Sequence, residues 1–258
     1  MAVDQLQATQ MGQHLLEYAS RWWAGEAEVA RTFFSRPHPP EEHLRWLRLQ
    51  AFKELQPRPN GIIIRNVEKL RTEYQDLERG VDRRAYLGTL QFVLEEFRHY
   101  VLFADVIDEI TGDRLMPEEL ATYELPEERK LRDVRETAMR QWGELARCAS
   151  SFCEGGGASI FYEGMQIGGD SLREHIAAAC RSVYEDEIDH ARHGVQDLVR
   201  VARTADDWAT AHRLVEAISR QRLQMRNEQF GFPLSEKRLE AIAQGKIELP
   251  ERFQALLV

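Results

Sequence analysis

Apolar residues recur every three or four positions through most of the chain, which is the spacing of amphipathic α-helices. Between positions 62 and 79, for example, Ile63, Val67, Leu70, Tyr74 and Leu77 recur at intervals of three and four. No segment alternates apolar and polar residues over a useful length, and the chain shows no repeat of fixed period. The pattern therefore predicts an all-α fold.

Short breaks rich in Gly and Pro separate the predicted helices. These helices cover residues 12–34, 41–56, 62–79, 82–110, 127–153, 171 to at least 193, 206–231 and 235–243, with a connector over 115–126. Asp82 and Asp170 stand where a side chain can cap the start of a helix. Because nothing marks a boundary between domains, we expect a single all-α domain over 1–258.

Two copies of a Glu-x-x-His motif lie on different predicted helices. Glu187 and His190 form one copy, and Glu96 and His99 form the other. On a helix, side chains three positions apart leave the same face, roughly 60° and about 4.5 Å apart. One such motif arises often by chance in helical proteins, but two copies indicate a pair of metal ligand sets.

A buried carboxylate without a partner costs several kcal/mol, so a helical core needs compensating charge if it holds several of them. Two divalent cations balance four glutamates when the histidines are neutral. Oxygen and imidazole ligands favour iron or manganese over metals that prefer thiolates. The sequence therefore predicts a site for two metal ions.

The spacing of the motifs suggests which further glutamates face them. In an antiparallel helical hairpin, facing ligands lie about equally far from the turn. The midpoint of Glu154 and Glu187 is 170.5, beside Gly169, and the midpoint of Glu68 and Glu96 is 82, just after Gly80. Each hairpin would therefore place one glutamate opposite one Glu-x-x-His motif.

Two other carboxylates compete with Glu68 for the place of the first ligand. Paired with Glu96, Glu73 gives a midpoint of 84.5, and Glu54 gives 75, which falls inside a predicted helix. Both fit worse than Glu68. On a helical wheel, however, the neighbours of Glu68 include Arg65 and Arg71, so its face has the polar character of a solvated surface.

The order of these ligands over about 62–200 resembles that of ferritin-like di-iron carboxylate oxidases and oxygenases. The resemblance implies a helical bundle with extra N- and C-terminal helices and two Fe ions, with two Mn ions or a mixed pair as alternatives. Haem-oxygenase-like di-iron oxidases have nearly the same ligand order, and both kinds of bundle remain open. Members of the haem-oxygenase-like family usually add a histidine seven residues before the last ligand, and arylamine N-oxygenases add one four residues before the last glutamate. Both positions correspond to Val183 here. The implied metal ligands are Glu68, Glu96, His99, Glu154, Glu187 and His190.

Residues around the motifs permit both functional and structural interpretations. His193 and Asp186 could be an extra ligand or support the ligands from behind, or belong to a solvated face. The glycines Gly155, Gly156 and Gly157 each cost about 1 kcal/mol inside a helix. They could leave room for dioxygen or substrate in a pocket that Tyr162 also lines, or form a loop after a helix that ends at Cys153.

Composition narrows the classes of partner. The net charge is −9 and the basic residues are scattered, so a nucleic-acid surface or an anionic membrane is not expected. No apolar run reaches the roughly 18 residues of a membrane span, and the N-terminus lacks a signal-peptide pattern. Three cysteines, an odd number, suggest reduced thiols and a cytoplasmic location.

We therefore expect an enzyme that uses a di-iron site and dioxygen to oxidise a small organic substrate. The reaction classes are hydroxylation, N-oxygenation, desaturation and C–C cleavage, and electrons would come from an external donor. A ferroxidase or peroxide-detoxifying protein without an organic substrate is the alternative. A homodimer remains open.

Overall fold

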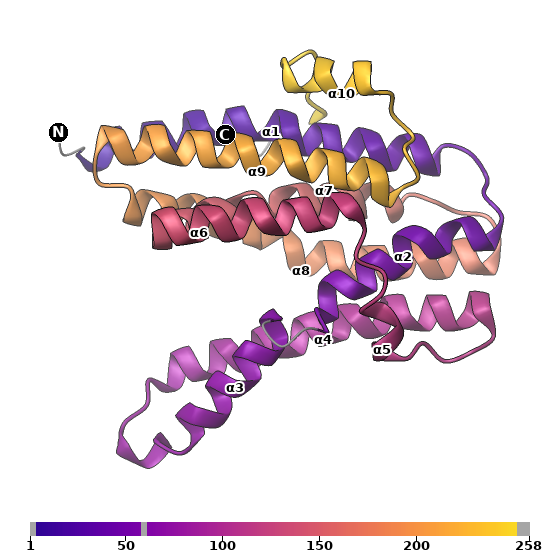
Figure 1. The fold of residues 1–258 in the computed structure, drawn as a ribbon, viewed down its shortest axis with the longest axis horizontal. Helices are drawn as coiled ribbons and strands as arrows, with labels where there is room; N and C mark the ends of the chain where they lie inside the picture. The colour runs from indigo at the N-terminus through magenta and orange to yellow at the C-terminus, as the bar shows by residue number, and fades with distance from the viewer. Residues whose placement is uncertain (1–3, 58–60, 252–258) are drawn as a thin grey trace. The chain divides into compact units, whose positions relative to one another are not determined.

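In the computed structural model, helices joined by turns and loops make up the part of the chain that is described (Figure 1). This part comprises residues 4–57 and 61–251 without the side chains of Gln5, Glu78 and 188–193, and it contains no strand. The predicted all-α fold is confirmed. In chain order, the helices are α1 (Gln5–Phe34), α2 (Pro40–Leu55), α3 (Ile62–Tyr74), the 3-10 helix η1 (Leu77–Arg79), α4 (Arg83–Thr111), α5 (Pro117–Leu120), α6 (Pro126–Phe152), α7 (Gly155–Gly164), α8 (Ser171–Val201), α9 (Ala205–Gln229) and α10 (Glu236–Ala243).

The helices pack into two compact units. Unit 1 contains α1, α6, α7, the part of α8 from Cys180 onward, α9 and α10. Unit 2 contains α2, α3, η1, α4, α5 and the first turns of α8, up to Ala179. Because unit 2 draws on two separate stretches of chain, no single linker exists in which a change of composition could mark the boundary.

In unit 1, α1 packs against α7 and α9, and α9 packs along α6 (Figure 1). Trp22 and Trp23 of α1 and Phe152 of α6 are fully buried, and the rings of Trp23 and Phe152 lie 5.7 Å apart. Each large aromatic side chain removes 150–250 Å² from water on average. This apolar core sets the positions of the polar side chains described below.

In unit 2, α2 and α3 both pack against α4. Trp46 of α2 is buried against Phe103 of α4, with ring centroids 6.1 Å apart in an edge-to-face arrangement. Phe52, one turn before the end of α2, is also buried. The apolar contacts between α2 and α4 therefore hold the C-terminal end of α2 beside the middle of α4.

Most predicted helix boundaries agree with the structure. Asp82 accepts hydrogen bonds from the backbone N–H groups of Arg84 and Ala85, and Asp170 accepts one from that of Arg173, so both predicted caps are confirmed. The first helix begins earlier than predicted, because Asp4 forms a capping box with Gln7. Helix α6 ends at Phe152, and the three glycines open α7.

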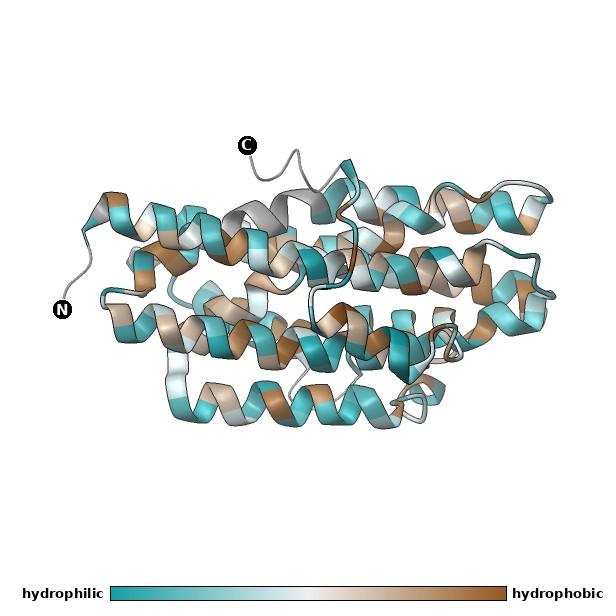
Figure 2. Ribbon diagram, turned by 90° about the horizontal axis from the view of Figure 1, so that it is seen from above, coloured by the Kyte–Doolittle hydropathy of each residue, from teal (hydrophilic) through white to brown (hydrophobic). Residues whose placement is uncertain are grey.

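Figure 2 shows apolar and polar residues interspersed around the helices rather than gathered in one continuous apolar run. In the described part of the chain, no helix combines the length and the apolar character that crossing a bilayer requires. The three cysteines, Cys148, Cys153 and Cys180, are buried and form no disulfide.

Candidate metal centre

Two carboxylates and an imidazole converge within unit 2. They belong to Glu54 at the end of α2 and to Glu96 and His99 of α4, and their ligand atoms all lie within 4.8 Å of one another. The Nδ1 atom of His99 is 3.8 Å from a carboxylate oxygen of Glu54. His99 is 0% exposed and Glu54 6% exposed, while Glu96 is half-buried. The sequence motif Glu96-x-x-His99 thus lies on one face of α4, as predicted.

The donor set of this group fits a divalent cation. It offers two carboxylate oxygens and one imidazole nitrogen, the combination that suits iron or manganese. Ligand atoms about 2.1 Å from an ion are at most about 4 Å apart, so side-chain movements of about 1 Å would close the group around a metal. The side chain of Gln50, one turn before Glu54 on α2, donates a hydrogen bond to the Glu54 carboxylate and orients it.

Glu68, which the sequence spacing selected as the first ligand, is not part of this group. The carboxylate that joins Glu96 and His99 is that of Glu54. The Glu68 side chain is 56% exposed and forms an ion pair with Arg71, 2.8 Å away. The register of the hairpin formed by α3 and α4 explains the difference. Lys69 Nζ donates a hydrogen bond to Thr89 Oγ1, so these two residues face each other and the hairpin is centred at 79 rather than at 82. Glu68 is therefore level with about residue 90, some 9 Å along α4 from Glu96.

Glu54 was not selected by the midpoint rule because that rule applies to facing helices that follow each other in the sequence. Helix α3 is inserted between α2 and α4, so the midpoint of Glu54 and Glu96 falls inside it. A local signal was available. Leu47, Gln50 and Glu54 occupy one stripe of α2 and all are buried, so Glu54 is a carboxylate on the core-facing side of a helix.

In unit 1, Glu154 lies between α6 and α7 and is held by two arginines. One carboxylate oxygen is 2.5 Å from Arg135 of α6, and the other is 2.9 Å from Arg222 of α9. The Glu154 side chain is 39% exposed, whereas Arg222 is fully buried. Glu154 belongs to unit 1 and is not a member of the carboxylate and imidazole group of unit 2.

Arg222 belongs to a buried charge cluster that the sequence did not reveal, made of Glu26, Arg222 and Arg226. Glu26 of α1 accepts hydrogen bonds from Arg222 at 2.9 and 3.1 Å and from Arg226 at 3.1 Å. All three side chains are at most 2% exposed. Burial alone would lower the pKa of Arg222, but the charges of Glu26 and Glu154 outweigh that effect and raise it.

The glycines beside Glu154 lie against buried side chains, among them Glu26 of this cluster, and do not border an open pocket. A methyl group on Gly156 would lie 2.1 Å from a carboxylate oxygen of Glu26, and one on Gly155 would lie 2.6 Å from the Trp23 ring. At Gly157 the nearest atoms, of Arg226 and Arg222, are 3.8 Å or more away. Beside Gly155 and Gly156, the space considered for dioxygen or substrate is therefore occupied. The alternative, a loop after Cys153, does not hold either, because the glycines form the first turn of α7.

The other predicted pocket residue, Tyr162 of α7, packs edge-to-face against Tyr184 of α8, with ring centroids 5.5 Å apart. Of the motif on α8, Asp186 and Glu187 have half-buried side chains, while the side chains of His190 and His193 lie outside the described residues. A methyl group on Gly194 would lie 2.8 Å from the Cα atom of Phe152. This contact brings α8, one turn after His190, beside the junction that carries Glu154.

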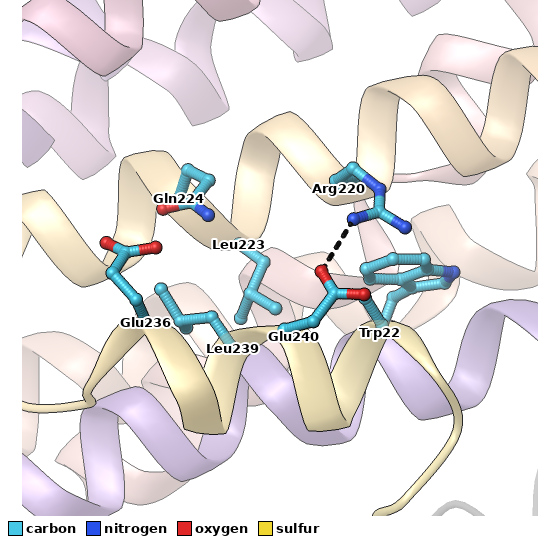
Figure 3. A pocket seen from close by; sticks show the side chains of 8 residues that line it. Trp22, Arg220, Leu223, Gln224, Glu236, Leu239 and Glu240 are labelled. Carbon is cyan, nitrogen blue, oxygen red and sulfur yellow. Dashed lines mark hydrogen bonds and ion pairs between the residues drawn. The ribbon is translucent and has the colours of Figure 1, made fainter.

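Unit 1 also contains a small cavity between α9, α10 and α1, lined by Trp22, Leu223 and Leu239 with the ion pair of Arg220 and Glu240 at one side (Figure 3). Its volume is about 50 Å³. Pockets for organic ligands usually measure 300–1,000 Å³, so this cavity is too small for a substrate.

Comparisons of the chain with models of protein families, with curated proteins and with solved structures find no match.

Proposed function

We propose that the chain is a non-haem di-iron oxidase or oxygenase that uses dioxygen to oxidise a small organic molecule. The observation that carries this proposal is the buried group of Glu54, Glu96 and His99 in unit 2. Placing a buried carboxylate, Glu54, and a half-buried one, Glu96, next to a buried imidazole is costly unless a cation joins them. A stability role alone gives no reason for that composition, whereas metal binding does.

The first ion would be held by Glu54, Glu96 and His99, with Glu54 in place of Glu68. The second Glu-x-x-His motif, Glu187 and His190 on α8, supports a second ion. Glu154 would be its additional carboxylate, in which case it exchanges Arg135 and Arg222 for the metal. After this exchange Arg222 would retain its two hydrogen bonds to Glu26.

Two bound ferrous ions would supply the electrons and coordination positions that dioxygen needs, while the protein would supply geometry and a dry environment. His99 would act as a neutral nitrogen ligand, and the glutamates would balance the metal charge. The near-complete burial of Glu54 and His99 keeps bulk water away from these two ligands. An external donor would restore the electrons, and the three buried thiols fit a reducing compartment such as the cytoplasm.

The decisive experiment is anaerobic titration with Fe(II), with metal content measured after removal of excess ion. We expect two irons per chain in the wild type, loss of at least one in Glu54→Ala and His99→Ala, and no loss in Glu68→Ala, the matched control. Rapid mixing with dioxygen then tests oxidation of the bound iron. Metal retained in Glu54→Ala but lost in Glu68→Ala would refute the site.

The same titration separates the proposal from simple iron oxidation. An oxygenase keeps its two irons through turnover and responds to a candidate organic substrate with a changed rate of iron oxidation. Release of ferric iron with no retained pair would instead indicate a ferroxidase.

A further inference from the structure

Helix α4 carries a second apolar face that is separate from its core-facing side. It consists of Leu87, Leu90, Leu94, Phe97 and Val101, which we call the α4 seam. These side chains are exposed by 53, 44, 68, 47 and 38% respectively. The intervals are three, four, three and four residues, the heptad spacing of a helix that pairs with another helix.

The seam lies opposite the metal ligands on the same helix. At 100° per residue, its five positions cluster about 170° from the midpoint of Glu96 and His99 on the helical wheel. The ligand side is covered by α2, and Lys69 of α3 reaches the same side through Thr89. Both covering helices belong to unit 2, so within this unit the seam is left uncovered.

From this seam we infer that two copies of the chain pair through α4 as an antiparallel helical dimer. In an antiparallel pair, the side chains that flank the seam on one edge of a helix meet their counterparts on the same edge of the partner helix. The flanking positions on the open edge are Arg84, Gln91, Arg98 and Asp105, all exposed. The other edge has Tyr86, Val93 and Tyr100, which are at least half-buried.

Charge complementarity indicates that the helix that covers the α4 seam is α4 of a second copy, running in the antiparallel direction. With the two-fold axis near Leu94, Arg84 of one copy lies opposite Asp105 of the other, and the symmetry creates this pair twice. A parallel pair would place Arg84 and Arg98 opposite the uncharged edge, with no ion pair. The same helix thus provides both the apolar seam and the complementary charges.

The exposed area sets the expected strength. The five side chains offer on the order of 500 Å² per copy, or roughly 1,000 Å² in total, at the low end for specific interfaces. We therefore expect a reversible dimer whose population depends on concentration. This inference does not rest on the proposed metal chemistry.

Sedimentation velocity of the full chain over a wide concentration range tests it. The wild type should dimerise, and Leu94→Lys should weaken the dimer more than about a hundredfold, because the change removes a central contact from both copies. Leu6→Lys is the matched control, since Leu6 of α1 is 69% exposed. It should leave the dissociation constant unchanged.

Charge reversal tests the direction of pairing. Arg84→Asp or Asp105→Arg alone should weaken the dimer about tenfold, and the double variant should restore it to within a few fold. A wild type that stays monomeric at every concentration would overturn the inference, because the seam would then be covered within one chain or by a different partner. A dimer insensitive to Leu94→Lys, or single reversals without effect, would overturn it as well.

Discussion

The two units of this protein bury carboxylates in contrasting surroundings. In unit 1, Glu26 is fully buried between Arg222 and Arg226. In unit 2, Glu54 and Glu96 approach each other and the imidazole of His99. The first arrangement joins a carboxylate to fixed cations of the chain. The second joins two carboxylates to a side chain that is neutral or cationic according to pH.

The difference between these surroundings indicates a structural role for the group in unit 1 and a metal-binding role for the group in unit 2. Guanidinium and carboxylate groups satisfy each other's charge and hydrogen bonds. The arginines Arg222 and Arg226 are balanced by Glu26 together with Glu154, so this group needs no ion from outside the protein. Two converging carboxylates repel each other, and a divalent cation turns that repulsion into attraction. We therefore expect substitutions in the first group to reduce stability, and substitutions in the second to reduce metal binding.

The largest effect is expected for Glu26→Ala, which leaves two buried arginines without their shared carboxylate. Breaking a buried ion pair in this way costs about 3–5 kcal/mol of unfolding free energy. Glu28→Ala is the control, because Glu28 pairs with Arg238 at a half-exposed position and should cost about 1 kcal/mol or less. Urea unfolding measures both, and equal losses would contradict the contrast between the units.

Acidification should destabilise unit 2 through His43. Burial, followed by the charges of His38 and Arg173, lowers the pKa of His43 from 6.5 to about 4. The folded state therefore resists a proton that the unfolded chain accepts, and stability falls as the pH drops from about 6.5 to about 4. The full loss is about 3 kcal/mol.

His43→Gln checks this pH dependence. In the wild type, His43 Nδ1 accepts a hydrogen bond from Trp46 Nε1, and the glutamine keeps an acceptor but does not titrate. Unfolding followed by Trp fluorescence at several pH values should show a smaller slope between pH 6.5 and 4 in the variant. An unchanged slope would assign the acid sensitivity to other groups.

We expect alanine substitutions at two neighbouring glycines of α7, Gly156 and Gly157, to have different effects on stability. Gly156→Ala should cost about 2 kcal/mol, because its methyl group collides with the buried Glu26 carboxylate. Gly157→Ala should be neutral or stabilise by up to about 1 kcal/mol, since its surroundings have room and alanine favours the helix. Thermal unfolding measures both, and a harmless Gly156→Ala would show that the space is open after all.

The smallest stability effect is expected for Glu54→Gln in metal-free protein. Removing one of two converging carboxylates should leave the unfolding free energy unchanged or raise it by about 1 kcal/mol, in contrast to Glu26→Ala. The glutamine can still accept the hydrogen bond from Gln50. In the wild type, Mn(II) should raise the unfolding midpoint, and this rise should disappear in the variant. A destabilised metal-free variant would instead make Glu54 a structural residue.

The sequence by itself determined the features that arise within a few residues of one another. The apolar spacing gave the helices, and the caps at Asp82 and Asp170 followed from side chains that reach backbone groups two or three positions away. The common face of Glu96 and His99 also followed from helix geometry alone. These features need no knowledge of what packs against them.

Only the tertiary structure decided which helices meet. Glu54 reaches Glu96 and His99 across an inserted helix, so a spacing rule for adjacent helices selected Glu68 instead. Glu26 meets Arg222 across 196 positions, and that contact fills the space beside Gly156. Pairings of this kind depend on the fit of whole apolar faces, to which many residues contribute small energies, and no local pattern records them.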